Sequence, residues 1–160
     1  MNWDALGAIS ETISAIAVIA TLAYLAVQIR QNTRATQTAS HHAITDSFNQ
    51  VNIAIAQNAE LAKIWVTGCT DRAALTDTER EQLDSLLRAV FHVFDSLFYS
   101  ANSGTGERNL LQAEEKGFSH LMNLRGVYSW WKDNPYAFSP EFRSYMEGFR
   151  ATVKENKSGE

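Results

Sequence analysis

The sequence is poor in cysteine and proline, with one residue of the first kind, Cys69, and two of the second. A single cysteine excludes an intramolecular disulfide and a zinc site built from several cysteines, which suits a cytoplasmic domain. The surrounding sequence, VTGCTD, does not indicate a catalytic thiol, so we expect Cys69 to be buried or incidental. Sustained alternation of apolar and polar residues is also absent, which predicts an all-α protein without strands.

An excess of positive charge is absent as well. The chain has 14 Lys and Arg residues against 18 Asp and Glu residues, for a net charge of −4, and the basic residues are dispersed. Domains that bind nucleic acids usually concentrate basic residues on one surface. We therefore expect no nucleic-acid partner.

Motifs for metals and phosphates are missing too. A helical carboxylate site would need Glu three residues before His, but the residues in that position before the four histidines are Thr38, Ala39, Ala89 and Gly117. The segment SGTGE lacks the lysine and the spacing of a phosphate-binding loop. We expect no metal site and no cofactor.

One long apolar run is present near the N-terminus. Eighteen consecutive uncharged residues lie between Glu11 and Arg30, and fourteen of them are apolar. Runs of this length are typical of transmembrane helices. A buried core helix of a soluble protein is the alternative, but such a helix usually keeps one polar face. The sequence thus predicts a membrane anchor in residues 1–30, with a span of about 6–29.

The charges that flank this run predict its orientation. Asp4 and Glu11 precede it, whereas Arg30 and Arg34 follow it, and no positive residue of the kind that opens a signal peptide comes before it. By the positive-inside rule, the N-terminus lies outside and the chain after residue 30 lies in the cytoplasm. Glu11 falls at the outer edge of the span, where a carboxylate among the lipid headgroups is favoured over an ion or proton site.

Small and polar residues of the span follow one another at spacings of three and four. This stripe consists of Gly7, Ser10, Ser14, Ala17 and Thr21. Small residues on one face let two helices approach closely in lipid, which predicts self-association through the stripe. The alternative is that Ala and Ser merely reflect the ordinary composition of a span.

The remaining chain predicts one helical domain, residues 31–155, followed by a frayed tail, 156–160. Glycine and proline are absent from 31–66, and one row of residues recurs there at spacings of three and four, so we predict a helix from about Arg30 to Val66. We call this row the seam; it consists of His41, Ile44, Phe48, Val51, Ile55, Asn58, Ala62 and Trp65. The seam faces either its own domain or a partner helix.

Capping signals predict where the later helices begin. Thr76 and Glu79 form a capping box, so a central helix should start just after Thr76 and end at the NSGTGE segment. A third helix is expected over 107–126, and Ser139 with Pro140 indicates the start of the last one. Together with the helix that leaves the membrane, these predict a cytoplasmic antiparallel bundle of about four helices.

Four polar residues of the central helix fall on one face, at spacings that let their side chains interact. They are Arg88, His92, Asp95 and Tyr99. A catalytic interpretation makes His92 a general base that Asp95 orients. Buried polar groups need hydrogen-bond partners with or without chemistry, so a buried structural network is favoured and no catalytic residue is assigned.

The most aromatic stretch of the chain lies beside the turn at Asn134 and Pro135. It consists of Tyr128, Trp130, Trp131, Tyr136 and Phe138. An aromatic cluster of this kind can form a partner-binding surface, and these five residues are the partner-binding candidates. The competing interpretation, which the sequence favours, is a plug that closes one end of the bundle.

At the anchor and at three later points, the chain resembles a family of short bacterial membrane proteins for which no activity is established. The opening WDALGAISETISAIAVIATLAYLAVQIRQNTRA is similar to the start of that family, and NAELAKIW, LTDTEREQ and WW followed by FSPEFRSYM resemble its later landmarks. The resemblance covers nearly the whole chain. It implies a single N-terminal span with a helical domain behind it, and it names no catalytic residue.

These features favour a non-enzymatic scaffold, sensor or regulator that is anchored in the bacterial inner membrane, acts at its cytoplasmic face and self-associates. Its partners would be the lipid bilayer, a second copy of the chain and an unidentified protein. A small oligomeric channel or transport subunit is the alternative, with the stripe facing a pore and Glu11 at its outer mouth. An enzyme that uses His92 and Asp95 ranks third.

Overall fold

The computed structural model describes the backbone of residues 3–103 and 108–157, and the side chains of these residues apart from 3–6, 8, 10 and 151–157. Six α-helices and one short 3-10 helix lie in these ranges, which contain no strand. The all-α prediction is therefore confirmed. The chain divides into two compact units, residues 1–39 and 40–160, which we call the N-terminal unit and the C-terminal unit.

Helix α1 (Trp3–Gln57) is the longest element and includes residues of both units. The large apolar side chains of its N-terminal part are exposed: Ile13, Ile16 and Ile19 are 62%, 61% and 67% exposed. The hydroxyl of Thr21 donates to the carbonyl of Ala17 at 2.8 Å, so this polar side chain is satisfied within its own helix. The prediction of a long apolar N-terminal helix is confirmed.

The prediction that this helix continues to Val66 is wrong. The chain leaves the helix at Asn58, whose backbone is extended (φ −127°, ψ 105°), and resumes as α2 (Ala59–Thr70). The side-chain oxygen of Asn58 accepts hydrogen bonds from the backbone N–H groups of Glu60 and Leu61 at 3.0 and 3.1 Å. Asn58 therefore acts as an N-cap, which satisfies the first amides of α2 and stops α1.

Helix α3 (Asp77–Asn102) follows the short 3-10 helix η1 (Arg72–Ala74) and begins where the capping box predicts. The Thr76 hydroxyl accepts from the N–H of Glu79 at 3.4 Å, and the Glu79 carboxylate accepts from the N–H of Thr76 at 2.8 Å. The bond from the Thr76 backbone, together with one from its hydroxyl, lowers the pKa of Glu79. The helix ends before Gly104 and Gly106 of the NSGTGE segment, which lie outside the described residues.

The third predicted helix, 107–126, corresponds to α4 (Arg108–Asn123), whereas the helix that follows it, α5 (Arg125–Asp133), was not predicted. They are divided at Leu124, whose backbone is extended. The last helix, α6 (Pro140–Lys157), begins as predicted, because the hydroxyl of Ser139 accepts from the N–H of Phe142 at 3.2 Å. The backbone of α6 is helical to Lys157, and the rest of the predicted frayed tail lies outside the described residues.

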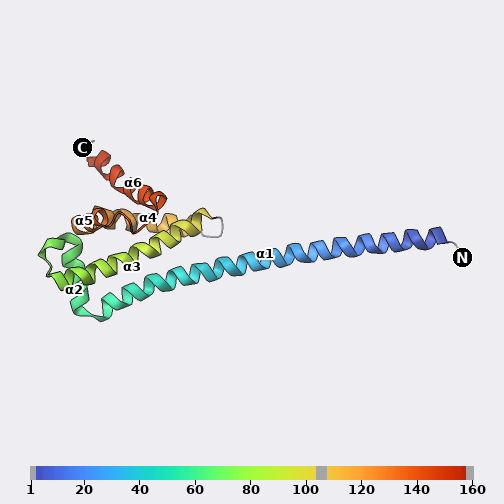
Figure 1. The fold of residues 1–160 in the computed structure, drawn as a ribbon, viewed down its shortest axis with the longest axis horizontal. Coiled ribbons are helices and arrows are strands. Elements are labelled where there is room, and N and C mark those ends of the chain that lie inside the picture. Colours follow the sequence, from blue (N-terminus) through green and yellow to red (C-terminus); the bar gives the residue numbers. More distant parts are fainter. Residues whose placement is uncertain (1–2, 104–107, 158–160) are drawn as a thin grey trace. The chain divides into compact units, whose positions relative to one another are not determined.

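Within the C-terminal unit, α2 packs against α3 and α5, and α4 packs against α3, α5 and α6 (Figure 1). Helix α3 is central to this packing, since Leu83, Leu87, Phe91 and Leu97 are fully buried. Arg72 adds a partly buried polar link: its Nε donates to Asp84 at 2.8 Å and its Nη1 to Asp133 at 3.1 Å. This guanidinium thus joins η1 to α3 and α5.

Candidate functional site

The predicted aromatic stretch belongs mainly to the core. Trp130 and Trp131 have no exposed surface, and Phe138 is buried. Both tryptophan rings pack on Phe91 of α3, with centroids 5.3 and 5.0 Å away, and Trp131 stacks on Phe138 at 5.3 Å. The structure corrects the assignment of these three residues as partner-binding candidates, because a partner cannot reach buried side chains. The position of the two tryptophans inside the core agrees with the plug interpretation.

The other two aromatic candidates lie in different surroundings. Tyr136 is 98% exposed at the turn between α5 and α6. Tyr128 is half-buried, and the guanidinium carbon of Arg150 lies 3.3 Å from the centroid of its ring. The five aromatic residues therefore do not form one surface.

The predicted buried network on α3 is wrong. His92 and Tyr99 are exposed, the latter by 74%, and Arg88 is exposed and donates to the side chain of Asn134 at 3.4 Å. Asp95 is half-buried, and burial raises its pKa while His92 lowers it. Among the described residues, no hydrogen bond joins these four side chains. The reason is that the apolar face of α3 occupies the core, which turns the polar face outward.

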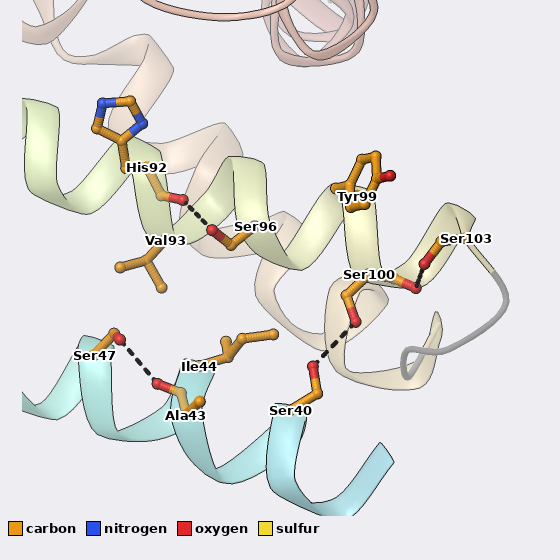
Figure 2. A pocket seen from close by; sticks show the side chains of 10 residues that line it. All are labelled: Ser40, Ala43, Ile44, Ser47, His92, Val93, Ser96, Tyr99, Ser100 and Ser103. Carbon is orange, nitrogen blue, oxygen red and sulfur yellow. Dashed lines mark hydrogen bonds between the residues drawn. The ribbon is translucent and has the colours of Figure 1, made fainter. Parts of the chain in front are cut away.

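A groove of about 530 Å³ lies between residues 40–47 of α1 and residues 92–103 of α3, both in the C-terminal unit. Figure 2 shows the side chains of Ile44 and Val93 between the two helices, with the rings of His92 and Tyr99 on the side of α3 away from α1. Ser40 and Ser100 are hydrogen-bonded across the groove at 3.4 Å. We call it the serine groove.

The serine groove does not contain a nucleophile and base in hydrogen-bonding contact. Ser47 donates to the carbonyl of Ala43 and Ser96 to that of His92, each at 2.8 Å, so both hydroxyl protons are held by their own helices. The imidazole of His92 accepts from none of the serines that line the groove in Figure 2. Without such a contact the hydroxyls are not activated for attack, and the groove offers polar contacts only.

A second hollow, of about 440 Å³, is apolar and is formed by the predicted seam. Five seam residues line it, namely Phe48, Val51, Ile55, Ala62 and Trp65. Val90 and Phe94 of α3 and Leu121 of α4 complete the apolar wall, and Glu114 and His120 of α4 add polar groups. We call this hollow the seam cleft. Its lining suits apolar side chains, with one carboxylate and one imidazole available for polar contacts.

The seam cleft could be found only in part from the sequence. The spacing of the seam predicts which residues of α1 and α2 share a face, and those residues are half-buried. The opposite wall comes from α3 and α4, and nothing in the spacing of the seam identifies Glu114, His120 or Leu121. Of the remaining seam residues, Ile44 is buried and Asn58 is exposed as the cap of α2.

The predicted features of the span lie on α1 in the N-terminal unit. Glu11 is exposed, as are Gly7, Ser14, Ala17 and Thr21 of the stripe. The side chain of Ser10 lies outside the described ones.

Cys69 is buried, as predicted. Its side chain is 3% exposed, and burial raises the pKa of the thiol to about 12. The thiol is therefore protonated at neutral pH and a poor nucleophile. In the part of the chain that the structure describes, no group of three or more His, Cys, Asp or Glu side chains is placed to hold a metal ion.

Comparisons with protein families, with curated proteins and with solved structures gave no match for this chain.

Proposed function

We propose that the chain is a single-pass membrane protein whose C-terminal unit is a helical bundle that binds a partner at the cytoplasmic face, as a scaffold, sensor or regulator. The observation that carries this proposal is the apolar run of α1. This helix contains an 18-residue window with a mean hydropathy of 2.0, of which no residue is buried. Leaving so much apolar surface in water is unfavourable, and a bilayer would cover it.

The energetics of insertion support the same proposal. Eight residues of 13–29 are Ile, Leu or Val, and each contributes roughly −0.3 to −0.6 kcal/mol at the centre of a span. Their sum is about −2 to −5 kcal/mol. A core helix of a soluble protein would instead be covered by its own domain, whereas the buried apolar residues of the described structure run from Ile44 to Met146.

Membrane extraction tests the anchor. We expect the full chain to stay with the membrane during an alkaline wash. The double variant Ile19→Arg, Leu22→Arg should lose this association, because charges at the middle of a span cost about 2.5–3.5 kcal/mol each. The matched control Gln31→Arg, Thr38→Arg adds the same charges to exposed positions of α1 beyond the run and should stay in the membrane. Release of the folded wild-type protein by the wash would contradict the anchor.

The orientation of the chain in the membrane can be tested with added cysteines. Cys69 is buried with a raised thiol pKa, so it is silent toward maleimides. Tyr136→Cys places a thiol at a 98% exposed position of the C-terminal unit. With the proposed topology, an impermeant maleimide labels this thiol only after the cells are broken. Labelling of intact cells would reverse the proposed orientation.

The seam cleft is the surface that we assign to the partner, because it is an apolar hollow left open in the C-terminal unit. Ile55→Cys puts a thiol in the cleft, and Ile53→Cys puts one on α1 outside it at a 50% exposed position. A short thiol-to-amine cross-linker applied to native membranes should give a discrete adduct with Ile55→Cys and none with Ile53→Cys. Equal cross-linking patterns from the two variants would contradict the assignment of the seam cleft as the partner-binding surface.

The pore hypothesis stays a weaker alternative. It needs polar groups of the stripe to face water, but the proton of the Thr21 hydroxyl is held by the carbonyl of Ala17. Ion flux into liposomes that is lost in Glu11→Gln would favour it over the anchor. Self-association through the stripe and membership of the bacterial family that the sequence resembles are proposed on the sequence patterns alone.

A further inference from the structure

A hollow of about 530 Å³ lies where the end of α2 and the start of η1 meet α5 and α6. Four of the residues that line it are basic, namely Arg72, Arg125, Lys132 and Arg150, and Tyr128 forms part of its wall. We call it the Tyr128 pocket. The sequence gives no hint of it, because its cations come from three separate segments of a chain whose net charge is −4.

The cations of this pocket are only partly neutralised. The charge of Arg72 is paired with both Asp84 and Asp133, and these contacts raise its pKa. Arg125 is 83% exposed and lies 3.8 Å from Asp71, a distance too long for a strong hydrogen-bonded pair. Among the described side chains, no carboxylate lies within ion-pair distance of Lys132 or Arg150. Among the described side chains, Arg125 therefore has one distant carboxylate, and Lys132 and Arg150 have none.

The guanidinium of Arg150 is held by an aromatic ring and has no acceptor among the described residues. It lies on the face of Tyr128, 3.3 Å from the ring centroid, and the ammonium of Lys132 lies 5.2 Å from the same centroid. The Nη1 atom of Arg150 is buried and has no hydrogen-bond partner among the described residues. A buried donor without an acceptor is costly, and the ring of Tyr128 stabilises the charge only in part.

We propose that the Tyr128 pocket binds a phosphomonoester, with Arg125, Lys132 and Arg150 as the groups that hold its dianion. Guanidinium groups match the oxygens of a phosphate in fork geometry, and an ammonium adds a further charge-assisted bond. The volume of the pocket exceeds that of a phosphate group, which leaves room for an organic part beside Tyr128. Helix dipoles neither favour nor oppose an anion in this pocket. The N-terminus of α5 attracts negative charge and the C-terminus of α2 repels it, and both lie here.

This inference does not rest on the proposed anchor. The phosphomonoester could be a soluble metabolite or the headgroup of a lipid, and both present the same dianion to the pocket. The test therefore uses the full chain in nanodiscs and two probes: glycerol 3-phosphate in solution, and phosphatidate as a component of the nanodisc.

Titration calorimetry in phosphatidylcholine nanodiscs should show saturable binding of glycerol 3-phosphate. Lys132→Gln and Arg150→Gln should each weaken it by about tenfold, the effect expected for losing one charge-assisted hydrogen bond. Arg125→Gln, at a position that is 83% exposed, gives a further variant that cannot disturb the core. The matched control Lys116→Gln removes an exposed charge of α4 outside the pocket and should bind as the wild type does.

Nanodiscs that contain phosphatidate distinguish a soluble phosphomonoester from a lipid headgroup as the ligand. Loss of glycerol 3-phosphate binding in these discs, restored when phosphatidylglycerol replaces phosphatidate, would mean that the lipid headgroup occupies the pocket. Undiminished binding would identify a soluble phosphomonoester as the ligand. The proposal is overturned if glycerol 3-phosphate does not bind at millimolar concentration in phosphatidylcholine discs. It is equally overturned if Lys116→Gln weakens binding as much as the three pocket variants do.

Discussion

At the residue scale, Gly126 of α5 lies close against the backbone of α2. A Cβ atom added there would meet backbone atoms of α2, the carbonyl oxygen of Gly68 and, at 2.8 Å, that of Cys69. Backbone cannot move aside as a flexible side chain can, so α5 is able to pack on α2 only because this residue has no side chain.

Gly126→Ala should therefore lower the free energy of unfolding by roughly 1–3 kcal/mol, the range expected for overpacking a buried contact. Urea unfolding followed by circular dichroism measures the loss. Gly148→Ala in α6 is the matched control, since nothing lies within 4 Å of its added Cβ. Alanine is the better helix former by about 0.5–1 kcal/mol, so this variant should be slightly more stable. A neutral Gly126→Ala would mean that α5 does not lie against α2.

The polar row of α3 shows what residue spacing can predict. The spacings of Arg88, His92, Asp95 and Tyr99 place them on one face of the helix, and they do share a face. Whether that face is buried depends on the competing row of Leu83, Leu87, Phe91 and Leu97, which fills the core. Periodicity identifies shared faces, whereas burial is decided by packing partners that are distant in sequence.

At the element scale, local caps were predictable and the break between α1 and α2 was not. The capping box at Thr76 and the cap at Ser139 depend on hydrogen bonds that reach only three residues along the chain, so the sequence reveals them. Asn58 has the same local chemistry, but the seam continues in phase across it through Ile55 and Ala62. Because the apolar spacing continues across Asn58, the sequence did not indicate that this residue caps α2 and ends α1.

Replacing this cap tests its role. Asn58→Ala removes the acceptor for the N–H groups of Glu60 and Leu61 and should lower the free energy of unfolding by about 1 kcal/mol. Asn58→Ser keeps an oxygen that can cap and should restore most of the loss. Thermal unfolding of the three proteins gives the comparison. If alanine and serine behave alike, the side chain of Asn58 does not act as a cap.

At the scale of the whole molecule, the two units differ in how their apolar residues are used. In the C-terminal unit the aromatic rings of α3, α5, α6 and the turn before α6 meet in one cluster around Phe91, Trp131, Phe138 and Phe142. In the N-terminal unit the large apolar side chains from Ile9 to Ile29 are exposed. The sequence predicted the apolar run of the N-terminal unit, because a long uncharged stretch can be recognised without knowing its tertiary contacts. It also favoured a buried plug for the aromatic stretch around Trp131, but it could not predict that Phe91 and Phe142 pack on this stretch, because they lie on other helices.

This contrast predicts that the C-terminal unit folds without the N-terminal one. The described core consists of residues from Ile44 onward, so a fragment of residues 36–160 keeps every contact of that core. Hydrogen exchange followed by mass spectrometry should find the same protection in α3 and α5 of this fragment as in the full chain in nanodiscs. Trp131→Ala in the fragment is the control that shows whether exchange in α3 responds to a destabilised core. Deleting a buried tryptophan costs about 3–5 kcal/mol, which should speed exchange in α3 by about a hundredfold or more. A fragment whose α3 exchanges as fast as that variant would show that the core depends on the N-terminal unit, and the division into an anchor and an independent helical unit would then be wrong.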